Sequence, residues 1–379
     1  MSVEKRSLPS GRVVWRARVY FQHRVITEKS FERKTDAKRW ETDQLAKLKT
    51  GGWIDPARGK VTFGVLADEW HESRSQLAVR SQETTRFMLD AYVVPVIGKL
   101  PVSAVSANDV DRVLTKMTER GLATASRRRA LSVMRLVLDY AVRDRRISDN
   151  VARAVTLPRG ATRHEPRWLR AEELRKLADA TPIACRAVVL FLGLTGCRFS
   201  EMAALRIDDV IHTQHGLGVR IHRAAPQSKS THAAIIGSTK THQTRTVPVP
   251  TTLDDYVRTR AAAASPGEYL FPSPTGAIWT NTNFRKRAKW AETTACVGLS
   301  GTRIHDLRHT AASLLIAAGA DVKAVQTILG HASATMTMDL YGHLFSDAPW
   351  VAMDKLPDLR GPDSQSPETP PDQGAPRSF

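Results

Sequence analysis

The opening stretch of the chain alternates apolar and polar side chains at the two-residue period of a β-strand. Within residues 11–34 the apolar members of the first run are Val13, Trp15, Ala17, Val19 and Phe21. A helix of about fifteen residues should follow from Lys34 and end at Gly51 and Gly52, because glycine commonly ends helices. The pattern predicts a small basic sheet with one helix over residues 1–57, which suits a DNA-binding module or an ordinary small α+β domain.

Residues 61–158 change to helical periodicity throughout. Ser106 is a good residue to cap one of these helices, and Gly121 a good residue to end it. The longest helix is expected over residues 123–146, with an apolar stripe formed by Leu131, Met134, Leu138 and Ala141. Four arginines lie largely off this stripe and either hold phosphates or are simply solvated: Arg127, Arg128, Arg129 and Arg135.

A polar, proline-bounded linker over residues 158–166 separates this helical region from a larger domain that begins near Trp168. The expected order there is two helices, strands within 217–224 and 244–250, and then helices again to about Lys355. The tail, residues 357–379, is rich in Pro, Ser and Asp and should be disordered. The fold class predicted is a multidomain, mainly α-helical chain with small β-sheets.

The charge of the chain indicates a polyanionic partner. Its 379 residues include 56 Lys and Arg against 38 Asp and Glu, a net charge of +18. Cations that neutralise phosphates release bound counterions and thereby drive binding, so nucleic acid is favoured over a mere excess of solubilising charge. The N-terminus lacks an apolar signal core, and the most apolar run, Ala187–Cys197, is too short to cross a bilayer. We therefore expect a cytoplasmic protein.

Several common chemistries have no motif in the sequence. There is no Gly-rich phosphate loop, dinucleotide fingerprint, calcium loop or HExxH pair, so we expect no cofactor and no metal. The three cysteines are far apart, which excludes a disulfide framework and fits a reduced compartment. His212, His215 and His222 flank a Gly-rich turn without a carboxylate or Cys in helical register, so they are not predicted to bind metal.

The second domain contains an unusual set of basic residues. In LTGCRFSEMAALRIDDV, Arg198 begins a helix, where the positive end of the helix dipole favours an anion, and Glu201 lies one turn later. In IHDLRHTAASLLIAAG, His305 and Arg308 share one helix face. We interpret Asp306 and His309 there as helix-start and packing residues.

Two further stretches complete the set. His331 follows Gly330 at the end of an apolar helix, and Tyr341 lies on the next helical segment. Lys240, in GSTKTHQTRTVPVP, is expected on a β-hairpin. Cys197 is assigned no redox role. Taken alone, Tyr341 is more simply a packing residue.

The four motifs TGCRFSE, STKT…RTVPVP, HDLRHT and LGH…Y occur in an order that resembles the tyrosine recombinases, also called the phage integrase family. The resemblance covers nearly the whole chain. It implies an arm-type DNA-binding module over 1–57, a helical core-binding domain over 61–158 and an α+β catalytic domain over 168–352. It also implies a site-specific recombinase that cleaves and rejoins DNA through a 3′-phosphotyrosine intermediate.

The resemblance implies a role for each residue. Arg198 and Arg308 match the pair that clamps the scissile phosphate, and Glu201 would orient Arg198. His305 and His331 match the two histidines that bind the phosphate. Tyr341 matches the nucleophile. Lys240 matches the lysine that protonates the leaving 5′-oxygen, although nearby Lys229 is an alternative acid.

The resemblance also implies partners. These are double-stranded DNA with core and arm sites, three further copies of the chain in a homotetramer, and possible host DNA-bending and excision factors near the nucleoid. The segment 342–356 would contact a neighbouring copy through Leu344, Phe345, Trp350 and Val351. The alternatives are a resident chromosome-dimer resolvase, a DNA-binding regulator or element remnant without catalysis, and a topoisomerase without site preference.

Overall fold

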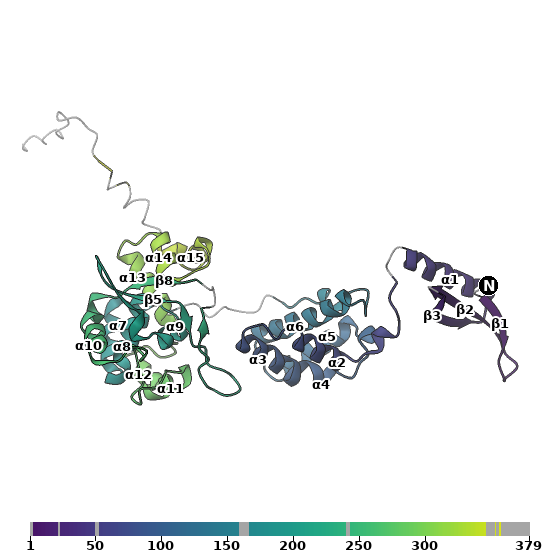
Figure 1. Cartoon of the computed structure of the whole chain (residues 1–379), viewed down its shortest axis with the longest axis horizontal. Coiled ribbons are helices and arrows are strands. Elements are labelled where there is room, and N and C mark those ends of the chain that lie inside the picture. Colours follow the sequence, from purple (N-terminus) through teal and green to yellow (C-terminus); the bar gives the residue numbers. More distant parts are fainter. Residues whose placement is uncertain are drawn as a thin grey trace, which may run out of the picture. The chain divides into compact units, whose positions relative to one another are not determined.

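The structure is a computed structural model that describes residues 3–21, 23–49, 53–158, 167–239 and 243–345, together with 353, 356 and 357. It divides into two compact units (Figure 1). The first comprises Met1–Glu165 with Pro226–Ile235, and the second comprises Pro166–Ala225 with Ile236–Phe379. Several expected features lie outside the described residues: positions 159–166 of the expected linker 158–166, Lys240, Trp350, Val351, and the tail from residue 358.

The N-terminal part of the first unit is a three-stranded antiparallel sheet with one helix. Its strands are β1 (Val3–Ser7), β2 (Val13–Phe21) and β3 (Arg24–Phe31), in that order. Helix α1 (Lys34–Lys49) packs against β2, and Ala17, Val19 and Ala37 are buried between them. The expected sheet and helix are present. The alternation did not predict β1, because VEKRS has no apolar repeat of its own.

The helical part of the first unit follows its predicted pattern closely. Its main helices are α2 (Phe63–Glu72), α3 (Val79–Met88), α4 (Val94–Ile97), α5 (Ala107–Glu119) and α6 (Thr124–Arg143). A π-helical turn, η2 (Leu89–Val93), joins α3 to α4, and 3₁₀ turns occur at η1 (Arg58–Lys60), η3 (Val102–Ala104) and η4 (Val151–Arg153). Ser106 caps α5, because its hydroxyl accepts from the Asp109 amide at 3.3 Å while Asp109 accepts from the Ser106 amide at 3.0 Å. The predicted α6 stripe is buried.

The second unit mixes helices with two small sheets. The sheet β4-β5-β8 consists of β4 (Val210–Thr213), β5 (Gly216–Ile221) and β8 (Arg245–Pro248), and the other pairs β6 (Arg223–Ala224) with β7 (Gly237–Ser238). The helices before the sheets are α7 (Ala171–Ala180), α8 (Ile183–Thr195) and α9 (Phe199–Ala204). Those after them are α10 (Asp254–Ala263), α11 (Asn281–Arg287), α12 (Trp290–Cys296), α13 (Asp306–Ala317), α14 (Val322–Leu329) and α15 (Ala334–Tyr341). Short 3₁₀ turns are η5 (Ile207–Asp209), η6 (Thr251–Leu253) and η7 (Gly342–Phe345).

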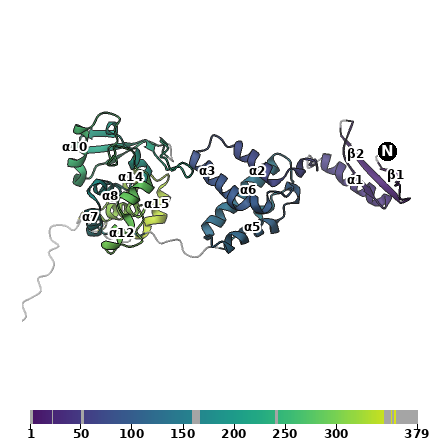
Figure 2. The ribbon, with the colours of Figure 1, turned by 90° about the horizontal axis from the view of Figure 1, so that it is seen from below.

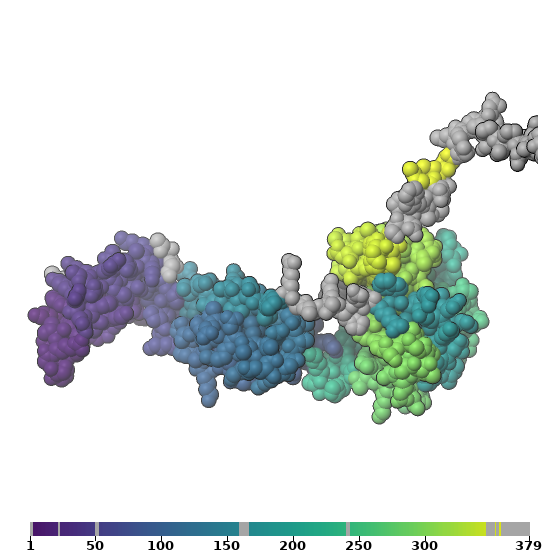
Figure 3. Space-filling view, turned by 180° about the vertical axis from the view of Figure 1, so that it is seen from behind, coloured from purple at the N-terminus to yellow at the C-terminus, as the bar shows by residue number. Residues whose placement is uncertain are grey.

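Helices α8 and α13 pack against each other at the centre of this unit. The C-terminal helices α14 and α15 lie side by side in both ribbon views (Figures 1 and 2), and α13 packs against α14. They form a continuous part of the unit's surface, coloured yellow-green in Figure 3. Beneath that surface Tyr341 packs in a small cluster with Ala312, Val325 and Leu329.

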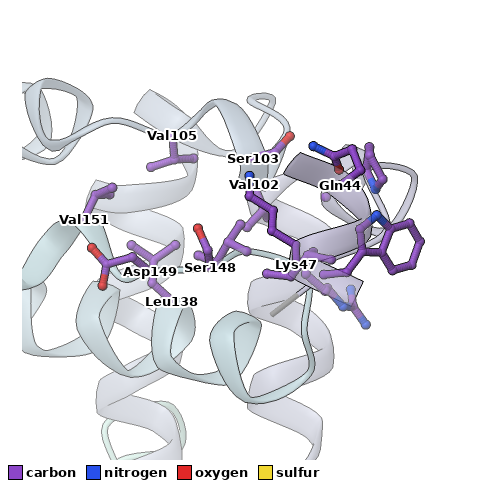
Figure 4. A pocket seen from close by; sticks show the side chains of 15 residues that line it. Gln44, Lys47, Val102, Ser103, Val105, Leu138, Ser148, Asp149 and Val151 are labelled. Carbon is purple, nitrogen blue, oxygen red and sulfur yellow. The ribbon is translucent and has the colours of Figure 1, made fainter. Parts of the chain in front are cut away.

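The first unit also contains a cavity of about 560 Å³ (Figure 4). Gln44 and Lys47 from α1 line one part of it, and Ser148 and Asp149 after α6 line another. None of the residues with candidate chemistry lines this cavity, so it is separate from the site described below.

Candidate active site

A tight turn between α8 and α9 places Arg198. Gly196 ends α8 in the left-handed conformation, with φ of 66°. A Cβ atom at this position would lie 2.3 Å from Cδ2 of Leu329, so only glycine lets the turn approach α14 this closely. Arg198 then occupies the N-cap of α9 as predicted, and its side chain is half-buried.

Glu201 holds two arginines at once. Its Oε1 accepts from Arg198 Nη1 at 2.8 Å, and its Oε2 accepts from Arg245 Nη2 at 2.7 Å and from the Arg198 amide at 3.0 Å. Burial opposes ionisation of this carboxyl, but the bonds and charges of Arg245 and Arg198 outweigh it and keep the pKa of Glu201 below its ordinary value. The carboxylate therefore fixes both the backbone and the guanidinium of Arg198.

Arg245 is a member of the site that the sequence analysis did not assign. It begins β8, donates from Nε to the Ile328 carbonyl at 3.0 Å, and its side chain is only 9% exposed. It thereby ties the sheet to the end of α14. A signal was present, since an arginine opens the otherwise apolar strand in RTVPVP, but its partner Glu201 is too distant in sequence to identify.

Arg308 brings a third guanidinium to the same place. Arg308 is only 5% exposed, and its Nη1 donates a hydrogen bond to the carbonyl oxygen of Gly196 at 2.6 Å. Burial, and then the charge of Arg198, lower the pKa of Arg308 to about 10. Its Nη2 is buried and has no hydrogen-bond partner within the described part of the chain. A buried donor of this kind is costly unless an acceptor reaches it, so the site is suited to an anion.

The two predicted histidines differ in exposure. His305 is exposed at the start of α13. His331 follows Gly330, the left-handed end of α14, and is 7% exposed, with Nδ1 2.9 Å from Oγ1 of Thr337. Burial, and then Arg308 and the other arginines, lower the pKa of His331 to about 4, so its ring is neutral at physiological pH.

Tyr341 is the last residue of α15 and is 2% exposed. Its ring is stacked with that of His331, with centroids 6.3 Å apart. Burial raises the pKa of Tyr341 to about 12, although Arg308 opposes the shift. The residue therefore packs in a core, as its sequence context taken alone favoured, while its role as the nucleophile stays a prediction.

The hydroxyl of Tyr341 lies 2.8 Å from Nδ1 of His309. The sequence analysis interpreted His309 and Asp306 as packing and helix-start residues. Both are buried, and Asp306 pairs with Arg303 at 2.8 Å, but packing alone is an incomplete description of His309. The only feature of the sequence that points to the contact of His309 with Tyr341 is that His309 directly follows Arg308 in the motif HDLRHT.

The remaining predicted residues are not all in this cluster. Lys240 lies outside the described residues. Lys229 belongs to the segment assigned to the first unit, where its amide donates to Glu83 at 2.9 Å and its ammonium lies 5.5 Å from the Phe87 ring. Leu344 and Phe345 pack against the cluster of Tyr341 in their own chain.

The arginines of α6 have different surroundings. Arg135 donates to the carbonyls of Ala152 and Val155 at 3.0 and 2.6 Å. Arg127 donates to the hydroxyls of two nearby threonines at 2.7 and 2.8 Å, whereas Arg128 and Arg129 are exposed. Their contact with DNA stays a prediction, which is now strongest for the exposed pair.

Comparison with known proteins decides the family. The phage integrase family model matches residues 167–347, and the phage integrase central domain model matches residues 63–157. The chain belongs to the phage integrase family. Curated relatives include the integrase of Mycobacterium phage D29, 25% identical over 83% of this chain and 85% of the relative. Tyrosine recombinase XerD of Corynebacterium glutamicum is 29% identical over 61% of this chain and 74% of the relative. The predicted family and enzyme class, a tyrosine-type DNA recombinase, are confirmed.

Solved structures share the fold of this phage integrase family chain. The Tn1549 transposon integrase in complex with a circular intermediate DNA matches with a TM-score of 0.67 and 18% identity, covering 78% of this chain and all of the other. A lambda integrase dimer bound to a core site matches with a TM-score of 0.55 and 15% identity, over 89% of this chain and 94% of the other. The predicted fold class is thus confirmed. No helix among the described residues is long and apolar enough to span a membrane.

Proposed function

We propose that this protein is a site-specific DNA recombinase of the integrase type, which inserts or excises a phage or another mobile element. One observation carries the proposal: the buried hydroxyl of Tyr341 belongs to the same region as Arg308 and as Arg198 and Arg245, the two arginines that share the carboxylate of Glu201. Such an excess of positive charge stabilises an anion, and a phosphodiester is the anion that a tyrosine can attack.

The scissile phosphate would be held by Arg198 and Arg308. A guanidinium group donates two parallel hydrogen bonds to two oxygens, which suits the non-bridging oxygens of a phosphate. Nη2 of Arg308 is the donor still in need of an acceptor. Arg245 and Glu201 would keep Arg198 in place without touching DNA themselves.

Tyr341 would supply the nucleophile. Its oxygen attacks phosphorus, a 3′-phosphotyrosyl bond forms, and the bond from phosphorus to the 5′-oxygen breaks. The tyrosine proton leaves toward a neutral imidazole or water, and the 5′-oxygen gains a proton to become a hydroxyl. Because one phosphate ester replaces another, the step can be reversed by a different 5′-hydroxyl without ATP. Cations near the phosphate favour the phenolate in the transition state.

The histidines and a lysine would bind the phosphate oxygens and transfer the protons of the reaction. His305 is exposed and His331 is neutral at physiological pH, so both can bond a phosphate oxygen or accept a proton. Lys240 is our choice for the acid that protonates the 5′-oxygen, with Lys229 as the alternative. Sulfur in place of that oxygen needs no acid, so such a substrate should restore cleavage to Lys240→Ala. Restoration of Lys229→Ala instead would reverse the assignment.

The DNA partner and the assembly are proposed from charge and similarity. The net charge of +18 supports binding of double-stranded DNA at core sites, with the basic sheet of residues 1–57 on separate arm sites. A solved structure of similar fold is a lambda integrase tetramer bound to a Holliday junction. We propose a homotetramer for this chain too, working in the cytoplasm at the nucleoid together with a host DNA-bending protein and an excision factor.

The extent of the similarity favours an integrase over a chromosome-dimer resolvase. The phage D29 integrase aligns with 83% of this chain, whereas the C. glutamicum XerD aligns with 61%. A second alternative, a DNA-binding regulator or element remnant without catalysis, would keep the fold but lose the cleavage chemistry. A third, a topoisomerase without site preference, is disfavoured by the arm-like module at residues 1–57, which favours site-specific assembly.

Covalent trapping tests the proposal. The protein is incubated without Mg²⁺ or ATP with nicked DNA fragments from around its own gene, so that the released end cannot reseal. We expect a protein–DNA band on a denaturing gel for the wild type and none for Tyr341→Phe. DNA binding by both proteins without a band for either, across fragments that tile the neighbouring genome, would favour the regulator.

A further inference from the structure

The Tyr341 side chain packs between two histidine side chains, and only one of them contacts its hydroxyl. The ring lies between two histidines, with centroids 5.8 Å from His309 and 6.3 Å from His331. Only His309 has a nitrogen at hydrogen-bond distance, its Nδ1 being 2.8 Å from the hydroxyl oxygen. Nδ1 of His331 instead lies 2.9 Å from the hydroxyl of Thr337. The attacking oxygen thus has one defined partner in the described part of the site.

His309 is itself held firmly. It lies near the start of α13 and is 9% exposed. Its ring packs edge to face against that of His305, with the two ring centroids 5.4 Å apart. Burial, and then His305, lower the pKa of His309 to about 4. The ring is therefore neutral and can accept through Nδ1 while Nε2 carries the proton.

Tyr341 lies at the junction of two short helical elements, so tertiary contacts with other elements define the position of its hydroxyl. Helix α15 has only eight residues, and Tyr341 is the last of them. The 3₁₀ turn η7 (Gly342–Phe345) follows it directly. A hydrogen bond to α13, the helix that also carries Arg308, fixes the hydroxyl relative to the arginines.

We propose that His309 is a positioning residue for the nucleophile: it accepts the Tyr341 hydroxyl and keeps it beside the phosphate-binding arginines of the same chain until DNA arrives. This inference rests on the function proposed above. His309 is not the base that ionises the tyrosine. Burial raises the pKa of the Tyr341 phenol and lowers that of the His309 imidazole, so both groups are neutral and the proton stays on the phenol.

Two substitutions separate positioning from proton transfer. Asn places its Oδ1 close to where His has Nδ1, so His309→Asn keeps an acceptor that cannot take up a proton. His309→Leu has similar bulk and no acceptor. In single-turnover covalent trapping we expect Asn to retain the wild-type rate within about threefold and Leu to lose about tenfold or more. DNA affinity should be unchanged in both, because His309 does not hold the phosphate.

The outcomes are distinct. Equal large losses in Asn and Leu would make His309 a base and overturn the positioning role. Wild-type rates in Leu would show that the bond is unimportant and overturn it as well. A wild type that gives no covalent complex on any DNA overturns the proposed function, and this inference with it.

A second measurement needs no DNA and tests the hydrogen bond even if His309→Leu lowers the stability of the protein. The unfolding equilibria of wild type, His309→Leu, Tyr341→Phe and the double variant form a thermodynamic cycle. If the hydrogen bond exists, the two substitutions should couple by about fivefold to tenfold in the unfolding constant. Independent effects, with no coupling, would contradict the bond from which the proposal starts.

Discussion

At the scale of single residues, the site buries several positive charges close together, although burial disfavours charged groups. Arg198, Arg245 and Arg308 lie close enough to influence one another, and Glu201 is shared between the first two. Arg308 is left with an unsatisfied donor in the described structure. Uncompensated charge of this kind lowers stability in the absence of a ligand and raises affinity for an anion, which is a common arrangement where function depends on binding.

Removal of Arg245 should destabilise the second unit by about 3 kcal/mol, because Glu201 would keep only one of its two arginines in a buried setting. The change is Arg245→Met, measured by urea unfolding. Arg258→Met is the matched control, since Arg258 pairs with Asp254 on the exposed face of α10. Equal effects of the two substitutions would show that burial of the Glu201 network is unimportant.

The low pKa of His331 gives a pH dependence of stability. Its pKa is about 4 in the folded protein against an ordinary 6.5, so between these values the unfolded chain binds the extra proton. Stability should therefore fall as the pH decreases from about 6.5 to about 4. In His331→Asn the slope should be smaller by up to about 1.4 kcal/mol per pH unit. The free energy of unfolding of both proteins, measured at pH 7, 6 and 5, gives the two slopes. The same slope in His331→Asn as in the wild type would mean that the pKa of His331 is not lowered by folding.

At the scale of elements, glycines decide how closely the helices approach the site. Gly330 ends α14 with φ of 69°, and a Cβ atom there would lie 2.8 Å from the guanidinium carbon of Arg245. The turn therefore sets the position of both Arg245 and the adjacent His331. It also explains why α14 is followed at once by the catalytic histidine that the family resemblance implies.

Gly330→Ala should reduce both stability and the rate of covalent complex formation. Gly319→Ala is a matched control, because Gly319 also has a left-handed φ, of 86°, yet a Cβ there meets nothing within 4 Å. The control should cost only the backbone strain, about 1–2 kcal/mol, without loss of cleavage. Similar cleavage rates in the two variants would contradict the role of close packing at Gly330.

The elements also show what the sequence could predict. The α6 stripe and the Ser106 cap were predictable, because periodicity and capping depend on residues within one turn or two. The contacts of Arg245 with Glu201 and of His309 with Tyr341 were not, since they join residues 44 and 32 positions apart through tertiary packing. The motifs contain the residues at both ends of these contacts, but nothing in the sequence shows which of them meet.

At the scale of the whole molecule, each chain contains the arginines, the histidines and the tyrosine within one compact unit. Because Tyr341 is buried against α13 of its own chain, a copy should cleave DNA with its own nucleophile. Mixed assemblies should therefore not combine the tyrosine of one copy with the arginines of another.

Mixing Tyr341→Phe with Arg308→Ala should leave covalent trapping at the background of either variant alone. The first lacks the nucleophile and the second lacks a phosphate ligand. A mixture of wild type with Tyr341→Phe is the control for subunit exchange, and should give a band in proportion to the wild type. A strong band from the two defective variants together would demonstrate attack by a neighbour's tyrosine.

The central claim is that the Tyr341 oxygen becomes bonded to DNA. The most direct measurement is to isolate the trapped complex, digest it with nuclease and trypsin, and locate the nucleotide by mass spectrometry. The tryptic peptide Ala324–Lys355 contains Tyr341 as its only tyrosine. The account predicts a nucleotide 3′-phosphate on this residue. A nucleotide on another residue, or a complex that Tyr341→Phe still forms, would contradict it.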